Sequence, residues 1–141
     1  MCGFVGTTDT HNVELMLSKQ EFRGPDGSKF WKDKNFAIGH CLLDINGEKQ
    51  FQPIKTKNGN IIAFNGEMYD STIQNDTVWL ANMYETYGIK VLEYSDWHGS
   101  IIHYNPQTGD LTLVRDHFGA KPLWYYKKGN NIEVSTSLRR F

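Results

Sequence analysis

The sequence predicts a single domain of the α+β class. Short apolar runs, typical of buried strands, alternate with turn sequences rich in Gly, Asn and Pro, and two segments place apolar residues at helical spacing. At 141 residues, the chain is long enough to bury roughly two-thirds of the surface that it exposes when unfolded. We therefore expect one domain over residues 1–141.

The first half of the chain predicts three strands and one helix. Residues 2–7, 36–39 and 61–64 are apolar runs suited to buried strands. A helical face is predicted after the Thr10/Asn12 start signal, and it consists of Val13, Met16, Leu17 and Gln20. This helix must end before the Gly- and Pro-containing loop at 23–27. In the polar segment before residue 61, Asn46-Gly47 and Asn58-Gly59 are candidates for tight turns.

The second half predicts one longer helix and two hairpins. Asp76 is the expected N-cap of a helix over 77–87, and Gly88 is its expected stop. One face of that helix is predicted to carry Trp79, Leu80, Met83, Tyr84 and Tyr87. The hairpins pair strand 100–104 with 111–114 and strand 123–126 with 132–135.

Composition excludes several classes of function. The net charge is −1 and the Lys and Arg residues are scattered, which argues against a nucleic-acid-binding surface. No apolar run approaches the ~18 residues of a membrane span, and the first residues lack the basic region and long apolar run of a signal peptide, so none is expected. Two cysteines indicate a reducing compartment, so we expect a cytoplasmic protein. The five histidines lack metal-ligand spacing with one another or with Cys41, so no metal site is expected.

The most informative residue is Cys2. Removal of Met1, which the small cysteine side chain permits, leaves a thiol and a free α-amine on one residue. An α-amine has a pKa of about 8 and a thiol of about 8.5, so near neutral pH the amine can take a proton while the sulfur attacks. The alternative is that Cys2 simply begins a buried strand.

Four motifs in a fixed order then resemble the amino-terminal glutaminase domain of asparagine synthetases. These motifs are Met1-Cys2-Gly3-Phe4-Val5-Gly6, Arg23-Gly24-Pro25-Asp26-Gly27, Phe64-Asn65-Gly66-Glu67-Met68-Tyr69 and the segment Arg115 to Leu123. That domain is a class II glutamine amidotransferase, one of the N-terminal nucleophile hydrolases. The resemblance implies a reduced αββα sandwich of two antiparallel sheets with flanking helices. It also implies hydrolysis of the side-chain amide of L-glutamine without a cofactor.

The resemblance implies roles for individual residues. Cys2 is the nucleophile, while the Asn65 side-chain amide and the Gly66 backbone N–H hold the oxyanion. Glu67 and Asp76 bind the α-amino group of glutamine, and Ile45 also belongs to the substrate-binding positions. Two alternatives stay open: Asn65-Gly66 matches a hairpin turn, and Asp76 is already explained as a helix cap, although this role can coexist with ligand binding.

The remaining motifs carry weaker implications. In the family, the loop at Arg23 packs beside the nucleophile and the arginine orders the amino terminus. A plain turn with a surface Arg-Asp pair would use the same residues. The Arg115 to Leu123 motif is expected to link two strands, and Cys41 is expected to be a small buried residue and not a second nucleophile.

The chain departs from the family at the site for the α-carboxylate of glutamine. The family follows its Gly-His with a charged residue and an arginine, whereas this chain reads Gly39-His40-Cys41-Leu42. The arginine is either replaced by Leu42 or deleted with a shortening of the loop. Loss of such a cation costs about 2 to 5 kcal/mol of binding. Lys49 is one candidate substitute.

A second departure concerns the acceptor of ammonia. Asparagine synthetases continue into a domain that activates the acceptor with ATP, and this chain contains no phosphate-binding glycine loop. We therefore expect a stand-alone glutaminase domain that supplies ammonia to a separate ATP-dependent synthetase. Two alternatives are a non-catalytic binding or regulatory subunit that has kept the fold, and an N-terminal nucleophile amidase that acts on another amide.

Overall fold

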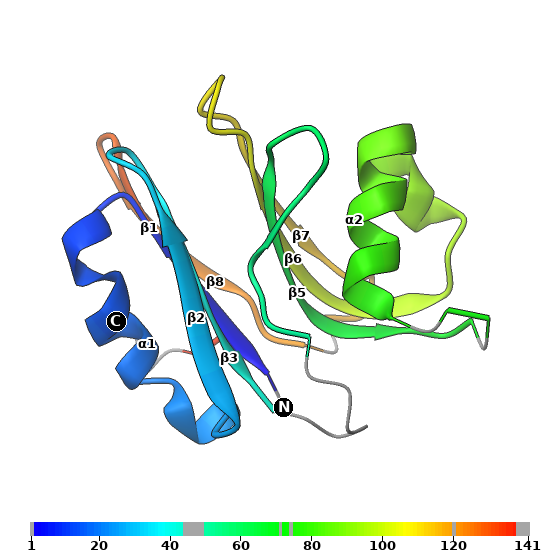
Figure 1. Cartoon of the computed structure of the whole chain (residues 1–141), viewed down its shortest axis with the longest axis horizontal. Coiled ribbons are helices and arrows are strands. Elements are labelled where there is room, and N and C mark those ends of the chain that lie inside the picture. Colours follow the sequence, from blue (N-terminus) through cyan, green and yellow to red (C-terminus); the bar gives the residue numbers. More distant parts are fainter. Residues whose placement is uncertain (1, 44–49, 71, 74, 120, 138–141) are drawn as a thin grey trace.

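A computed structural model describes residues 2–43, 50–70, 72–73, 75–119 and 121–137. Two antiparallel sheets pack face to face, with helix α1 (Val13–Ser18) on the outside of one sheet and helix α2 (Asp76–Tyr87) on the outside of the other (Figure 1). This four-layer arrangement confirms the predicted α+β sandwich.

The first sheet has five strands in the order β2-β3-β1-β9-β8. Their bounds are β1 Gly3–Thr7, β2 Gly27–Lys32, β3 Ala37–Leu42, β8 Trp124–Lys128 and β9 Asn131–Ser135. Strands β1 and β3 are buried along their whole length, because α1 covers one face and the second sheet covers the other. Their continuous apolar sequences follow from burial on both faces.

The second sheet has four strands in the order β4-β5-β6-β7. Their bounds are β4 Ile54–Lys55, β5 Ile61–Met68, β6 Trp97–Tyr104 and β7 Leu111–Arg115. Leu80 and Ala81 of α2 pack against Ile62, Phe64 and Ile101 on its outer face. Short 3₁₀ helices complete the described chain at η1 Thr10–Asn12, η2 Glu21–Arg23 and η3 Gly88–Glu93.

The apolar core between the sheets fills one end and the middle of the sandwich. At that end, Phe36 stacks on Tyr104 with ring centroids 4.7 Å apart. In the middle, Gly6 lies against Ile102 of the second sheet, and a Cβ on Gly6 would sit 2.6 Å from Ile102 Cδ1. Glycine at position 6 therefore lets the two sheets approach closely.

The structure corrects several element predictions. Strand β2 was missed because its residues are half-buried or exposed and give no apolar run. The Arg23 loop therefore leads directly into a strand. Strand β5 continues beyond the predicted end to Met68, and β6 begins at Trp97, three residues before the predicted start. Tyr87 is the last residue of α2 and is 64% exposed, so burial along the predicted face of α2 does not extend to the end of the helix.

Two turn predictions have different outcomes. Asn58-Gly59 does form a turn between β4 and β5, where the Gly59 N–H donates to Thr56 O (2.9 Å) and Gly59 has a φ of 84°. Asn46-Gly47 lies outside the described residues. Gly88 ends α2 with a φ of 73°, as predicted, although the 3₁₀ helix η3 then follows directly.

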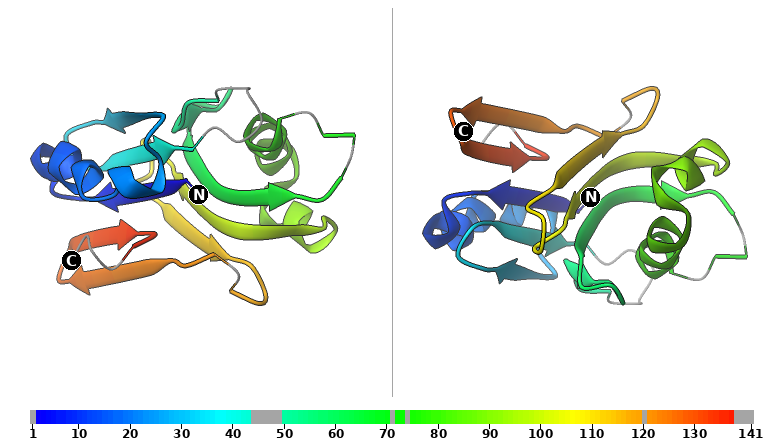
Figure 2. Two further views of the ribbon diagram at one scale, coloured as in Figure 1. Left: turned by 90° about the horizontal axis from the view of Figure 1, so that it is seen from below. Right: turned by 90° about the horizontal axis from the view of Figure 1, so that it is seen from above.

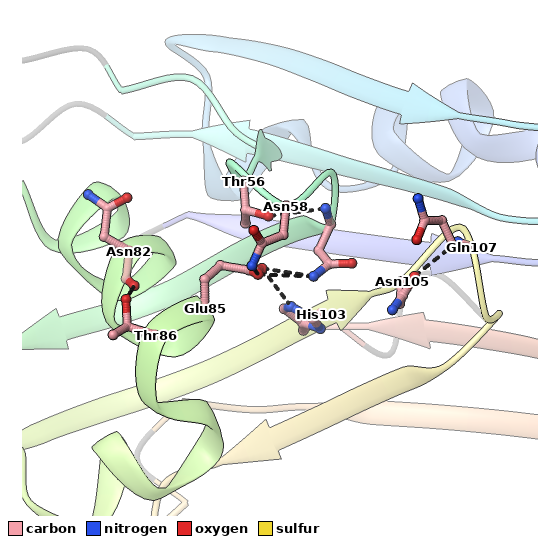
Figure 3. A network of polar contacts seen from close by, with 9 residues as sticks. Thr56, Asn58, Asn82, Glu85, Thr86, His103, Asn105 and Gln107 are labelled. Atoms are coloured by element: carbon pink, nitrogen blue, oxygen red, sulfur yellow. Dashed lines mark hydrogen bonds and ion pairs between the residues drawn. The ribbon is translucent and has the colours of Figure 1, made fainter.

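A buried carboxylate attaches α2 to the second sheet. Glu85, whose side chain is 4% exposed, accepts hydrogen bonds from Asn58 Nδ2 (2.6 Å) and Asn60 Nδ2 (2.9 and 3.1 Å) in the β4–β5 turn, and contacts His103 Nε2 (3.4 Å) on β6 (Figure 3). Burial acts to raise the pKa of Glu85, but hydrogen bonds from Asn60, Thr56, Asn58 and His103 outweigh it and hold the pKa below its usual value. The carboxylate therefore stays charged and bonded at neutral pH.

Replacement of Glu85 by Ala should destabilise the fold by about 1 to 3 kcal/mol, because it leaves Asn58 and Asn60 without their acceptor. The free energy of unfolding from urea denaturation measures this, with the exposed Glu93→Ala as the control. The pKa of Glu85 is lower in the folded than in the unfolded protein. Its stabilisation is therefore complete at a pH above the pKa of an unfolded glutamate, and it is lost as the pH falls through the pKa of folded Glu85. An effect no larger than that of Glu93→Ala would contradict the assignment.

Candidate functional site

The candidate site lies at the end of the sandwich opposite the Phe36–Tyr104 stack. Cys2 directly precedes β1, whose first residues lie beside the second sheet at this end (Figure 2). In the first sheet, Gly6 of β1 lies opposite Ile38 of β3. The next pair on the same face, closer to this end, is Phe4 and His40. In the second sheet, Ala63 of β5 lies opposite Ile102 of β6, and the next pair on the same face, closer to this end, is Asn65 and Ser100. Strand β5 approaches both β1 and β3, so these positions face one another.

The Cys2 thiol is held by the main chain of Leu43. The Leu43 N–H donates to Cys2 Sγ (3.3 Å), and the thiol contacts Leu43 O at 3.7 Å. These two contacts fix the position of the Cys2 sulfur relative to the end of β3. Sequence reasoning missed Leu43, because a main-chain donor leaves no trace in the residue type.

Arg23 lies beside the same residue. Its Nε donates to Cys2 O (3.3 Å), and it comes from a loop that packs tightly on β3, since a Cβ on Gly24 would sit 2.4 Å from the Cys41 carbonyl carbon. Burial lowers the pKa of Arg23, and the nearby thiol groups of Cys2 and Cys41 act in the opposite direction. The geometry is that of a loop packed beside the amino terminus and not of a plain surface turn.

Asn65 and Gly66 lie within β5 and not in a turn. Asn65 pairs with Ser100 and Gly66 with Gly99, which excludes the hairpin-turn interpretation. The Asn65 side chain is on the inner face, the residue is 2% exposed, and Nδ2 has no hydrogen-bond partner among the described residues. A Cβ on Gly66 would sit 2.1 Å from His98 O, so only glycine fits at this position.

Asp76 is not the helix cap. The N-cap of α2 is Asn75, whose side chain accepts from the Val78 N–H (3.0 Å). The carboxylate of Asp76 instead accepts from the Met68 N–H (3.1 Å) at the end of β5. Two adjacent cap-forming residues explain the error, because local sequence does not distinguish them. Glu67, on the same stretch of β5, is exposed.

The substrate-binding loop is only partly described. Ile45 and Lys49 lie outside the described residues. Leu42, one of the two positions considered for the missing arginine, is the last residue of β3 and is 6% exposed.

Two further polar residues at this end were missed by the sequence analysis. His40 is 1% exposed and Ser100 is fully buried, and the described residues provide no hydrogen-bond partner for either ring nitrogen of His40 or for Ser100 Oγ. Burial lowers the pKa of His40 to about 4, so its ring is neutral near neutral pH. For His40, the signal in the sequence was a histidine within an otherwise apolar strand. Ser100 gave no comparable signal.

Cys41 is a different kind of cysteine. It is fully buried against α1, its Sγ donates to Leu17 O (3.6 Å), and burial raises the pKa of its thiol to about 11. Cys41 is therefore an inert core residue, as predicted.

Other possible sites are distinct from this one. A shallow cavity lies at the opposite end of the sandwich and includes Phe36, Tyr104 and Ile132 but none of the candidate site residues. Within the described ranges, no group of three His, Cys, Asp or Glu side chains is arranged to hold a metal ion. None of the helices in the described part of the chain has the length and apolar character that crossing a membrane requires.

Comparison with known families agrees with this arrangement. The family model described as "Glutamine amidotransferase domain" matches residues 1–141, so the chain belongs to the glutamine amidotransferase family. Its relatives include asparagine synthetases, and the chain is a class II member close to those enzymes, as the motifs predicted.

Three curated relatives each match most of this chain over a small part of their own length. Asparagine synthetase (glutamine-hydrolyzing) 2 of Bacillus subtilis is 27% identical, with 99% of this chain and 22% of the relative covered. Asparagine synthetase (glutamine-hydrolyzing) 1 of the same organism is 26% identical, with 89% and 24% covered. Amidase chry2 of Gibberella zeae is 25% identical, with 92% and 22% covered. The chain spans less than a quarter of the length of these relatives.

The two cysteines should differ in reactivity. With limiting iodoacetamide near neutral pH, we expect the partly exposed Cys2 to be alkylated and the buried Cys41 to stay unmodified until the protein is unfolded in urea. Peptide mass spectrometry measures both sites, and Cys41→Ser should leave the labelling of Cys2 unchanged. Equal labelling rates in the folded protein would contradict the placement of the two thiols.

Proposed function

We propose that this chain is a glutaminase-type domain in which Cys2, freed of Met1, attacks the side-chain amide of glutamine. The observation that carries the proposal is the buried, unpartnered Nδ2 of Asn65 at the end of the sandwich where Cys2 lies. A buried donor without a partner is costly, and a ligand oxygen at this position would satisfy it.

The reaction follows from the positions of these groups. Cys2 Sγ attacks the amide carbon while its proton passes to the free α-amine, and the Asn65 amide and the Gly66 N–H hold the oxyanion. The C–N bond breaks and ammonia leaves with the proton returned by the amine. Water then hydrolyses the thioester to glutamate. The Leu43 N–H, at 3.3 Å from Sγ, and the Arg23 side chain, which donates to Cys2 O, hold Cys2 in position for this attack.

Recognition of the substrate is assigned to the end of β5. Glu67 and Asp76 are the proposed partners of the glutamine α-amino group, and Ile45 is a further proposed contact. If the family arginine is replaced by Leu42 or deleted from the loop, the α-carboxylate lacks its usual cation. We therefore expect weak glutamine binding, with a loss of about 2 to 5 kcal/mol relative to a site with the arginine.

The ammonia acceptor is proposed to be on another polypeptide. The two Bacillus subtilis relatives are named asparagine synthetases, and this chain matches less than a quarter of each. We propose an ATP-dependent synthetase on a separate polypeptide as the partner of this domain. A second candidate function is a degenerate binding subunit or an amidase for another amide. The buried Leu42 favours it, as does the similarity to a protein named an amidase.

The nucleophile is tested with glutamine and its analogue 6-diazo-5-oxo-norleucine. Protein that has lost Met1 should release ammonia from glutamine and be labelled on the Cys2 peptide, whereas Cys2→Ala should do neither. A non-cleavable amino-terminal tag should abolish turnover, because the α-amine is then part of a peptide bond. Turnover by the tagged protein would contradict the mechanism, and labelling of Cys2 without turnover would favour the degenerate subunit.

The partner is tested by affinity capture from the native cell with a carboxyl-terminal tag. We expect to recover an ATP-dependent synthetase, because free ammonia would otherwise be lost to solvent. The captured complex should form its amide product from glutamine only with intact Cys2. Capture with Cys2→Ala should recover the same partner, and recovery of no nucleotide-dependent ligase would contradict a delivery role.

A further inference from the structure

Three buried polar side chains lie on the facing inner surfaces of the two sheets, at the end of the sandwich where Cys2 lies. His40 is 1% exposed, Asn65 is 2% exposed and Ser100 is fully buried. Both ring nitrogens of His40, Asn65 Nδ2 and Ser100 Oγ have no hydrogen-bond partner in the part of the chain that the structure describes. We call these three residues the intersheet polar cluster.

The cluster is built from both sheets. His40 lies on β3 opposite Phe4 of β1, two residues from Cys2. Ser100 lies on β6 directly opposite Asn65 of β5, where paired side chains are about 5 Å apart. Because side chains alternate between the two faces of a strand, all three point toward the opposite sheet. They lie one residue pair closer to Cys2 than the contact between Gly6 and Ile102. Since Asn65 is also the proposed oxyanion donor, the cluster lies next to the place where the oxyanion forms.

The chemistry of the cluster fits a small neutral molecule. Each unpaired buried polar group costs about 1 to 3 kcal/mol, so several in one place need a common partner. The neutral ring of His40 offers one donor and one acceptor, the Ser100 hydroxyl offers both, and the Asn65 amide offers donors. A water molecule can accept two hydrogen bonds and donate two, and a buried one typically has 2–4 polar partners.

We propose that His40 and Ser100 hold the water molecule that hydrolyses the Cys2 thioester, and that Asn65 Nδ2 donates one of its two hydrogens to this water and the other to the oxyanion. This inference rests on the proposed function. The water oxygen forms a bond to the thioester carbonyl carbon, and the C–S bond breaks. One water proton passes through the α-amine to the Cys2 sulfur, and the product is glutamate. Since the pKa of His40 is lowered to about 4, its ring is a weak base, and its role is to position the water.

The test uses His40→Leu and Ser100→Ala. Both variants remove unpaired polar atoms from the core, so thermal denaturation should show stability that is unchanged or higher. Steady-state hydrolysis of glutamine should nevertheless fall about 10- to 100-fold, since the attacking water is no longer oriented. Intact mass spectrometry should detect the glutamyl thioester in both variants. Hydroxylamine, which attacks the thioester in place of water, should restore ammonia release and form γ-glutamyl hydroxamate.

Matched variants separate the inference from the proposed function. His11→Leu and Ser18→Ala make the same changes at exposed positions and should behave as wild type. Asn65→Ala should slow thioester formation itself, and hydroxylamine should not rescue it. If His40→Leu and Ser100→Ala turn over normally, or lose activity without thioester accumulation or hydroxylamine rescue, the water site is wrong while the proposed function stands. A wild type that releases no ammonia would overturn both.

Discussion

The burial of β1 between β3 and β9 is the constraint on which the rest of the structure depends. Every residue of β1 is buried, and backbone bonds to both neighbours fix its position. Thr136 adds to this, because its Oγ1 accepts from the Phe4 N–H (3.1 Å). A strand held on both edges and both faces has little freedom, so Cys2, the residue before it, is fixed relative to the second sheet. Precise placement of this kind is what a nucleophile beside an oxyanion donor requires.

The two ends of the sandwich differ in the chemistry of the space between the sheets. The end at Phe36 and Tyr104 is filled by stacked rings and aliphatic side chains, and it gives the domain its apolar core. The other end buries His40, Asn65 and Ser100 without partners among the described residues, which lowers stability. Buried polar groups that the fold leaves unpaired indicate that this end is adapted to a ligand and not to packing.

Much of the fold follows from local sequence, whereas the site depends on pairing between distant segments. Strands β1, β3 and β5 were predictable because burial on both faces makes them apolar. The half-exposed edge strand β2 gave no such pattern. Asn65-Gly66 matched a turn locally, but its place in the β5–β6 ladder depends on residues 99 and 100. The Leu43 N–H reaches Cys2 across 41 positions in the sequence. The motif resemblance predicted Cys2 and Asn65 as site residues, but no local pattern pointed to Leu43 or Ser100.

The central claim is that Cys2 and Asn65 act on one carboxamide. The most direct measurement is a crystal structure of the protein, lacking Met1, after reaction with 6-diazo-5-oxo-norleucine. We predict continuous density from Cys2 Sγ to the ligand, with the ligand's carbonyl oxygen within about 3 Å of Asn65 Nδ2. The ligand's α-amino group should lie beside Asp76. A covalent ligand whose carbonyl oxygen points away from Asn65, or a reaction at any residue other than Cys2, would contradict the account.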